Sequence, residues 1–150
     1  MTEKERNAKA KAWLKRYGDA KRKVDRLKAE LDELTAHQEG ADAIKYTDMP
    51  KAPGIDGDLS DLFVQREKIR TDITKAMTHA TMIMTSIRSV IDEIPDPATQ
   101  QVISLRYISG VKWDKIGEMM SYSLARVHQL HRAGLGEIYR LVHCRGAKTT

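Results

Sequence analysis

The side chains best suited to chemistry lie between residues 123 and 141, where apolar residues recur at helical spacing. Val127, Leu130, Gly134 and Ile138 form the predicted buried stripe of this helix. The opposite side carries residues that can reach the edges of DNA bases in a major groove: Leu124, Ala125, His128, Gln129 and Arg132. This segment is therefore the candidate reading helix.

The residues before this helix predict a helix-turn-helix. Trp113–Met120 is expected to form a short helix, and only residues 121–123 separate it from the next one. Ile116 faces inward, and Gly117 is small where the two helices approach each other. Ser123 is a good N-cap because its hydroxyl can accept a hydrogen bond from an N–H group of the first turn.

Cations around the turn are candidate contacts to DNA phosphates. Arg126 lies in the first turn of the reading helix, where a phosphate and a base are equally suitable partners. Lys112, Lys115 and Arg106 add predicted contacts to the sugar-phosphate backbone. Double-stranded DNA is the partner that this arrangement predicts.

Five short runs in this region resemble region 4 of sigma-70-type sigma factors. They are Leu105–Gly110, Trp113–Gly117, Ser123, Arg126–Leu130 and Leu135. Region 4 reads promoter −35 elements and touches RNA polymerase, so the resemblance implies both DNA and RNA polymerase as partners. It covers residues 96–141, under a third of the chain.

The whole chain resembles the ArpU/RinA-like late transcription regulators of phages that infect Gram-positive bacteria. Those proteins join a helical N-terminal part, a linker that contains proline and glycine (here Met49–Gly57) and the sigma-like motif. The resemblance implies a phage late-gene activator that works with host RNA polymerase in the cytoplasm of a bacterial cell. Nothing in the chain resembles the part of a sigma factor that reads −10 elements, so a stand-alone promoter-melting sigma factor is not expected.

Three positions depart from the common form of this motif. Many such motifs have glycine where this chain has Ser121, and alanine where it has Gly117 and Gly134. A serine in a left-handed turn costs about 1 kcal/mol relative to glycine, and glycine inside a helix costs about as much relative to alanine. These departures predict a module of reduced stability.

Long helices are expected before the motif. Over residues 1–39, apolar residues recur at alternating spacings of four and three, with mostly charged residues between them. These seam residues are Trp13, Tyr17, Ala20, Val24, Leu27, Leu31 and Leu34. A second stripe of the same spacing covers residues 59–94, where the methionines 77, 82 and 84 are expected in the core. A linker with proline and glycine, residues 40–58, separates the two helices.

The predicted fold class is all-α. Long N-terminal helices, arranged as a coiled coil or an antiparallel hairpin, precede a helix-turn-helix domain over residues 95–145 and a short tail over residues 146–150. The two seams can close within one chain or between two chains, and both arrangements agree with the sequence. A homodimer through the long helices is the expected assembly.

Charge and composition agree with this outline. The chain has a net charge of +5 and an isoelectric point near 9.3, with 31% charged and only 5% aromatic residues. That balance is typical of helical proteins rather than of β-sandwiches. The net charge is +3 over residues 1–39, −2 over residues 40–94 and +4 over residues 95–150. The basic ends favour an anionic partner such as nucleic acid.

Several classes of protein are not expected. Cys144 is the only cysteine, so an intramolecular disulfide is impossible, and the chain has neither a signal-peptide pattern nor a membrane-length apolar run. His128 and His131 lie three residues apart but are expected to diverge, and no CxxC motif accompanies them, so no metal is predicted. Without a phosphate-binding loop or a nucleophile–base pair, the chain is predicted to need no cofactor and to be no enzyme.

Two other functions stay open. A small DNA-packaging, terminase-like or assembly subunit also joins a helix-turn-helix to coiled-coil helices, and it would form a ring. An RNA polymerase-binding module could use the sigma-like part without specific contact to DNA.

Overall fold

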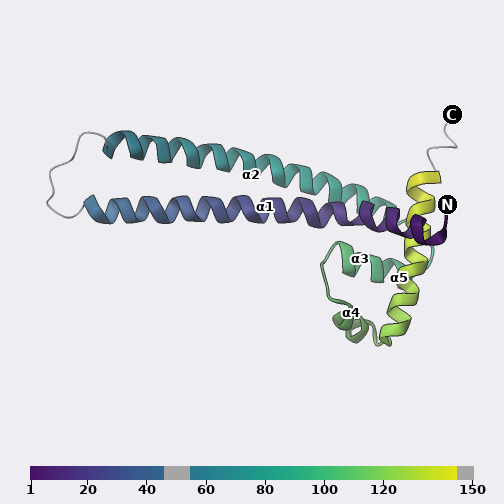
Figure 1. Ribbon diagram of the computed structural model, residues 1–150. Coiled ribbons are helices and arrows are strands. Elements are labelled where there is room, and N and C mark those ends of the chain that lie inside the picture. The colour runs from purple at the N-terminus through teal and green to yellow at the C-terminus, as the bar shows by residue number, and fades with distance from the viewer. Residues whose placement is uncertain (46–54, 145–150) are drawn as a thin grey trace. The chain divides into compact units, whose positions relative to one another are not determined.

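The computed structural model describes residues 1–45 and 55–144, and the side chains of residues 1–37 and 60–144 (Figure 1). The described residues form helices and connecting turns without a strand. The helices are α1 (Glu3–Lys45), α2 (Ile55–Ile91), α3 (Pro97–Tyr107), α4 (Trp113–Met120) and α5 (Leu124–Tyr139), and α5 continues into one π-helical turn, η1 (Arg140–Cys144). The predicted all-α class is confirmed. None of these helices combines the length and the apolar character that a membrane crossing requires.

The chain divides into two compact units. One unit, the hairpin, comprises residues 20–79, which hold most of α1 and α2. The other unit comprises residues 1–19 and the described residues from 80 onward, which include α3, α4 and α5.

In the hairpin, α1 and α2 run side by side in opposite directions (Figure 1). Val24, Ile73 and Ala76 are buried, and Leu27, Leu31 and Ile69 are half-buried. These residues belong to the two predicted seams. The seams of the hairpin therefore close against each other within one chain.

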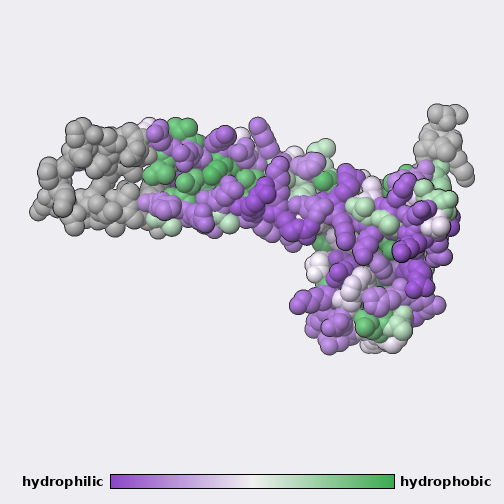
Figure 2. Space-filling model, viewed as in Figure 1, coloured by the Kyte–Doolittle hydropathy of each residue, from purple (hydrophilic) through white to green (hydrophobic). Residues whose placement is uncertain are grey.

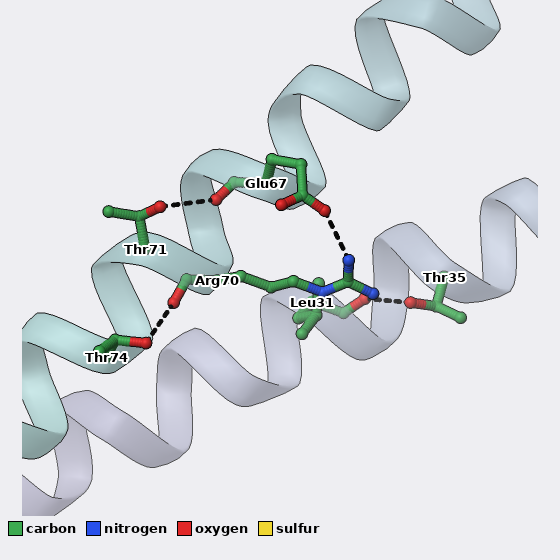
Figure 3. A network of polar contacts seen from close by, with 6 residues as sticks. All are labelled: Leu31, Thr35, Glu67, Arg70, Thr71 and Thr74. Atoms are coloured by element: carbon green, nitrogen blue, oxygen red, sulfur yellow. Dashed lines mark hydrogen bonds and ion pairs between the residues drawn. The ribbon is translucent and has the colours of Figure 1, made fainter.

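Several polar contacts of the described hairpin residues lie within one helix. In Figure 3, the Arg70 guanidinium donates to Glu67 at 2.6 Å on α2, and on α1 the Thr35 hydroxyl donates to the Leu31 carbonyl at 2.9 Å. The Thr71 and Thr74 hydroxyls likewise donate to carbonyls four residues earlier. Exposed pairs of this kind contribute little to stability, so the apolar seam carries most of the packing.

The bounds of the long helices differ from the predicted ones. α1 continues to Lys45 and α2 begins at Ile55, so both helices extend into the predicted linker of residues 40–58. The centre of that linker, residues 46–54, lies outside the described residues, as does the predicted tail. α2 ends at Ile91, three residues before the predicted end, and Ile94 packs as a buried residue of the following turn.

The prediction that the methionines of α2 lie in the core is wrong for two of them. Met77 is 47% exposed and Met82 is 67% exposed. Isoleucine and alanine residues already fill the buried side of the helix: Ile73, Ala76, Ala80, Ile83 and Ile87. Met77 and Met82 therefore lie outside the buried side of α2.

The first turns of α1 belong to the unit that contains the helix-turn-helix. They begin with a capping box, in which the Thr2 amide donates to the Glu5 carboxylate at 2.8 Å and the Glu5 amide donates to the Thr2 hydroxyl at 3.2 Å. Ala10 and Leu14 are fully buried, although neither belongs to the predicted seam. The Tyr139 hydroxyl of α5 donates to the Met1 sulfur at 3.3 Å. The N-terminal turns of α1 thus pack into this unit.

Candidate nucleic-acid interface

The module that carries the candidate site begins with a well-capped α3. The Asp96 carboxylate accepts hydrogen bonds from the Thr99 amide at 3.1 Å and the Thr99 hydroxyl at 2.6 Å. These hydrogen bonds lower the pKa of Asp96 below its ordinary value. Pro97 occupies the first turn, where its missing N–H has no consequence. The start of α3 is therefore fixed by local chemistry.

A compact core joins the three helices of the module. Val102 of α3, Ile116 of α4 and Val127 of α5 are fully buried, and Leu130 is nearly so. Apolar residues packed around them are partly buried: Ala98, Leu105, Val111, Trp113 and Met120. The predicted inward faces of α4 and α5 are confirmed. This core fixes which side of α5 remains exposed.

The turn between α4 and α5 has the geometry that the sequence predicts. Ser121 adopts a left-handed conformation with φ 58° and ψ 40°. The Tyr122 amide donates to the Gly117 carbonyl at 2.9 Å. A β-carbon built on Gly117 would lie 3.0 Å from the Tyr122 carbonyl oxygen, which explains the small residue there.

The predicted reading helix, α5, has Ser123 as its N-cap, as expected. The Ser123 hydroxyl accepts a hydrogen bond from the Arg126 amide at 3.2 Å. The residues of the predicted reading face are all exposed: Leu124, Ala125, Arg126, His128, Gln129 and Arg132. The Arg126 guanidinium donates to the Gln129 side-chain oxygen at 2.8 Å. A guanidinium and a carboxamide therefore lie side by side on the exposed face.

The other predicted phosphate contacts have different surroundings. Lys112 and Lys115 are exposed, and Lys115 lies 3.5 Å from Glu118. Arg106 is half-buried, with its guanidinium 4.5 Å from the centre of the Trp113 ring and donating to the Val111 carbonyl at 3.3 Å. Arg106 therefore packs against the module, whereas the side chains of the two lysines are exposed to solvent.

A cluster of aromatic and histidine side chains, which the sequence did not predict, joins α5 to α3 and α4. The Tyr107 hydroxyl and His131 Nε2 share a hydrogen bond at 2.7 Å, and the Trp113 ring meets the His131 ring edge-on at 4.6 Å between centroids. The His128 ring packs against the Trp113 ring, with 5.0 Å between the two ring centroids. The cluster links α3, α4 and α5, and it includes His128 of the predicted reading face.

Burial decides the charge state of this cluster. It lowers the pKa of His131 to about 4 and raises the pKa of Tyr107 to about 12, so both groups are neutral near pH 7. The Tyr107 hydroxyl can then donate to Nε2 of a histidine that carries its proton on Nδ1. Within the described residues, no group of three or more His, Cys, Asp or Glu side chains could hold a metal ion.

Gly134 has a packing role that the sequence did not predict. A β-carbon built there would lie 2.6 Å from Cγ1 and 2.7 Å from Cδ1 of Ile103. Ile103 is fully buried on α3, so the missing side chain allows α3 and α5 to approach closely. The expectation that Gly134 merely weakens the helix is therefore wrong, because its helix-propensity cost is offset by this contact.

Large apolar side chains are exposed where α4 meets α5. Met119 is 54% exposed and Leu124 is 48% exposed. Figure 2 shows hydrophobic residues gathered at this end of the module, while hydrophilic residues cover most of its remaining visible face. Leu124, at the start of α5, thus adds an apolar group to the predicted reading face.

Comparison with known proteins identifies the module. Residues 96–140 match the family described as sigma-70, region 4. No curated protein and no solved structure matches the chain. The match covers α3, α4 and α5 together with the first residue of η1. The module over residues 96–140 is a helix-turn-helix of the sigma-70 region 4 kind, and this family supports a DNA-binding regulator.

Proposed function

We propose that this protein is a sequence-specific DNA-binding transcription regulator whose helix α5 reads a major groove. One observation carries the proposal: the polar and basic side chains of α5 lie on its exposed side, while a buried three-helix core holds the opposite side. A helix-turn-helix presents its second helix to DNA in this way. Gln129 is the proposed base contact, supported by His128 and Ala125, and Arg132 is proposed to contact a phosphate that flanks the same groove.

The pairing of Arg126 with Gln129 suggests how the face is organised. A carboxamide reads adenine by accepting one hydrogen bond from the base and donating another to it. The bond from Arg126 at 2.8 Å holds the Gln129 oxygen on the exposed side, and the guanidinium itself lies in the first turn, where a phosphate is favoured. Arg126 therefore orients Gln129 and neutralises a neighbouring phosphate.

Backbone contacts complete the proposed interface. Lys112 and Lys115 are exposed next to and within α4, and each can neutralise a phosphate. Arg106 stays a predicted phosphate contact. Its contacts with Trp113 and Val111 also suit it to positioning α4 against α3.

The finer assignment is a phage late-gene activator that works with host RNA polymerase in the cytoplasm of a bacterial cell. Its support is the order of parts, with long helices before a module of the sigma-70 region 4 kind. RNA polymerase is the protein partner that sigma-like modules suggest. Transcription from candidate promoters with and without the protein would test activation directly.

The long helices are the proposed surface for a homodimer. Because the hairpin seams close within one chain, a second copy would need another surface. Phe63 is 57% exposed and Met77 is 47% exposed, and their spacing of two heptads puts them on one face of α2. Light scattering should show a dimer that Phe63→Glu dissociates. A ring would instead favour the DNA-packaging alternative.

Selection of binding sites from random duplex DNA tests the proposed function. We expect a discrete enriched site, and we expect Gln129→Ala to weaken binding to it about 5- to 150-fold, the range for a lost base contact. Arg132→Ala should weaken binding to any duplex, because a phosphate contact carries no sequence information. Arg88→Ala is a matched control, because Arg88 is an exposed arginine of α2 outside the module. Failure to enrich a site, or equal binding by all three variants, would contradict sequence-specific reading by α5.

A further inference from the structure

A recess of about 570 Å³ lies beside the reading face. One wall is formed by the first two turns of α1, including Glu3, Arg6 and Asn7. The other wall is formed by α5 and η1, including Arg132 and Arg140. Both walls belong to the same compact unit. The residues of α1 lie outside the part that matches the sigma-70 region 4 family.

The recess is continuous with the proposed DNA-reading face. Gln129 and Arg132 belong to both. Further along α5, Gly136 lines the recess, and a β-carbon built on it would meet no atom within 4 Å. No side chain projects from this position, and the recess is open next to Gln129, the residue proposed to contact a base.

The spacing along α5 suits a DNA backbone at this place. Arg132 follows Ala125 by seven residues, which is about 10 Å along a helix at 1.5 Å per residue. The major groove is about 12 Å wide. When the N-terminal turns of α5 contact bases, residues near position 132 therefore approach the phosphates that flank the groove.

The charges around the recess favour an anion. Arg6 and Arg132 line opposite walls and are exposed. Arg140 also lines the recess, but it donates to Glu137 at 2.8 Å, which neutralises its charge in part. Glu3 is the acidic residue of the lining. Three guanidinium groups against one lining carboxylate leave a net positive site, and guanidinium groups bind phosphate oxygens with two parallel hydrogen bonds.

We infer that this recess holds a phosphate of the DNA strand that flanks the groove read by α5, with Arg6 and Arg132 as its ligands. The inference rests on the proposed function, and it deepens that function by giving α1 a direct part in DNA binding. A contact to the backbone carries no sequence information. Arg6 should therefore contribute equally to binding of any duplex, whereas Gln129 should contribute only at the selected site.

The test measures the salt dependence of binding for the full chain, with the selected duplex and a mixed-sequence duplex as probes. Arg6→Ala should weaken binding to both duplexes about 3- to 10-fold and reduce the slope of log K against log salt by about 0.9, which corresponds to one phosphate. Arg6→Lys should keep the slope. Lys4→Ala is the matched control, since Lys4 is exposed and lies two residues away, about 200° around the helix.

A second comparison asks whether the two arginines share one phosphate. If they do, Arg6→Ala combined with Arg132→Ala should lose less affinity for the mixed-sequence duplex than the product of the two single losses. Thermal unfolding should give the same midpoint for Arg6→Ala and Lys4→Ala, because both side chains are exposed.

The two proposals fail in different ways. If Arg6→Ala matches Lys4→Ala in affinity and salt slope, the phosphate site is overturned, while Gln129→Ala still tests reading by α5. If Arg6→Ala loses affinity only for the selected duplex, Arg6 reads sequence and the phosphate site is also overturned. If the full chain binds neither duplex, both proposals are overturned.

Discussion

The hairpin and the helix-turn-helix module are both helical, but they are packed in different ways. In the hairpin the most buried side chains, such as Val24 and Ile73, keep 7–9% of their surface exposed, and most seam residues are only half-buried. In the module, Val102, Ile116 and Val127 are completely buried between three helices. The hairpin buries a narrow row of side chains between two helices, whereas the module encloses its core between three helices.

This difference shows where the identity of a single residue matters. The packing of a two-helix seam repeats along the helices, so each side chain has similar neighbours. The truncation of one side chain therefore removes only a small part of the contacts that stabilise the seam. The module instead depends on single features that occur once: a left-handed Ser121, a close contact at Gly134 and the pair formed by Tyr107 and His131. Substitutions should therefore have larger and more position-specific effects in the module.

Core truncation should give the largest contrast. Ile116→Ala removes a completely buried side chain and should lower the free energy of unfolding by about 3 kcal/mol, within the usual range for large-to-small changes. Leu31→Ala removes a half-buried side chain of the hairpin and should cost about 1 kcal/mol. Urea unfolding followed by circular dichroism measures both. Equal losses would show that the seam is as closely packed as the module.

The two glycines of α5 should respond to alanine with opposite signs. Gly134→Ala places a β-carbon within 2.7 Å of two Ile103 atoms and should destabilise the module by about 1–3 kcal/mol. Gly136→Ala meets open space and should stabilise the helix by about 0.5–1 kcal/mol. Adding Ile103→Ala should make the loss from Gly134→Ala smaller. A stabilising Gly134→Ala would contradict the proposed packing role.

The stability of the module should depend on pH through His131. Its pKa is about 4 in the folded state and 6.5 ordinarily, so between these values the unfolded chain binds more protons. The free energy of unfolding should therefore fall as pH falls from 6.5 to 4, by about 1–2 kcal/mol after allowance for partial exposure. His131→Gln should flatten this dependence in urea titrations at pH 4.5 and 7. An unchanged dependence in the variant would assign the effect to other groups.

Substitution by glycine should have opposite signs in the two regions. Ser121→Gly relieves a left-handed conformation and should stabilise the module by about 1 kcal/mol. Lys21→Gly, at an exposed position of α1 in the hairpin, should destabilise the chain by about 1 kcal/mol. Thermal unfolding of the two variants measures this smallest effect. Destabilisation by Ser121→Gly would mean that the serine side chain stabilises the turn.

Local patterns in the sequence predicted much of the module. The bounds of α4, the Ser123 cap and the left-handed turn at Ser121 are as expected. The buried stripe of α5 and its exposed opposite face also agree with the predicted periodicity. These features depend on capping, backbone conformation and helical spacing, which act over a few residues along the chain.

Other predictions failed or were missing because they depend on residues far apart in the sequence. Gly134 is explained by Ile103, thirty-one residues earlier, and His131 by Tyr107, twenty-four residues earlier. Ala10 and Leu14 are buried in a unit whose other residues begin only at position 80. No spacing rule indicates such partners. The seam could likewise close within one chain or between two, and periodicity is the same in both cases.

Local sequence patterns therefore predict the helices, the turn and the polar face of α5, because hydrophobic period and capping chemistry are local properties. Contacts between distant segments instead account for three features: the hairpin seam closes within the chain, α5 packs on the cluster of Tyr107, His131 and Trp113, and Arg6 lines a recess beside Arg132. The physical reason is that burial and charge proximity arise where distant segments meet, and these contacts depend on distances that sequence spacing does not specify.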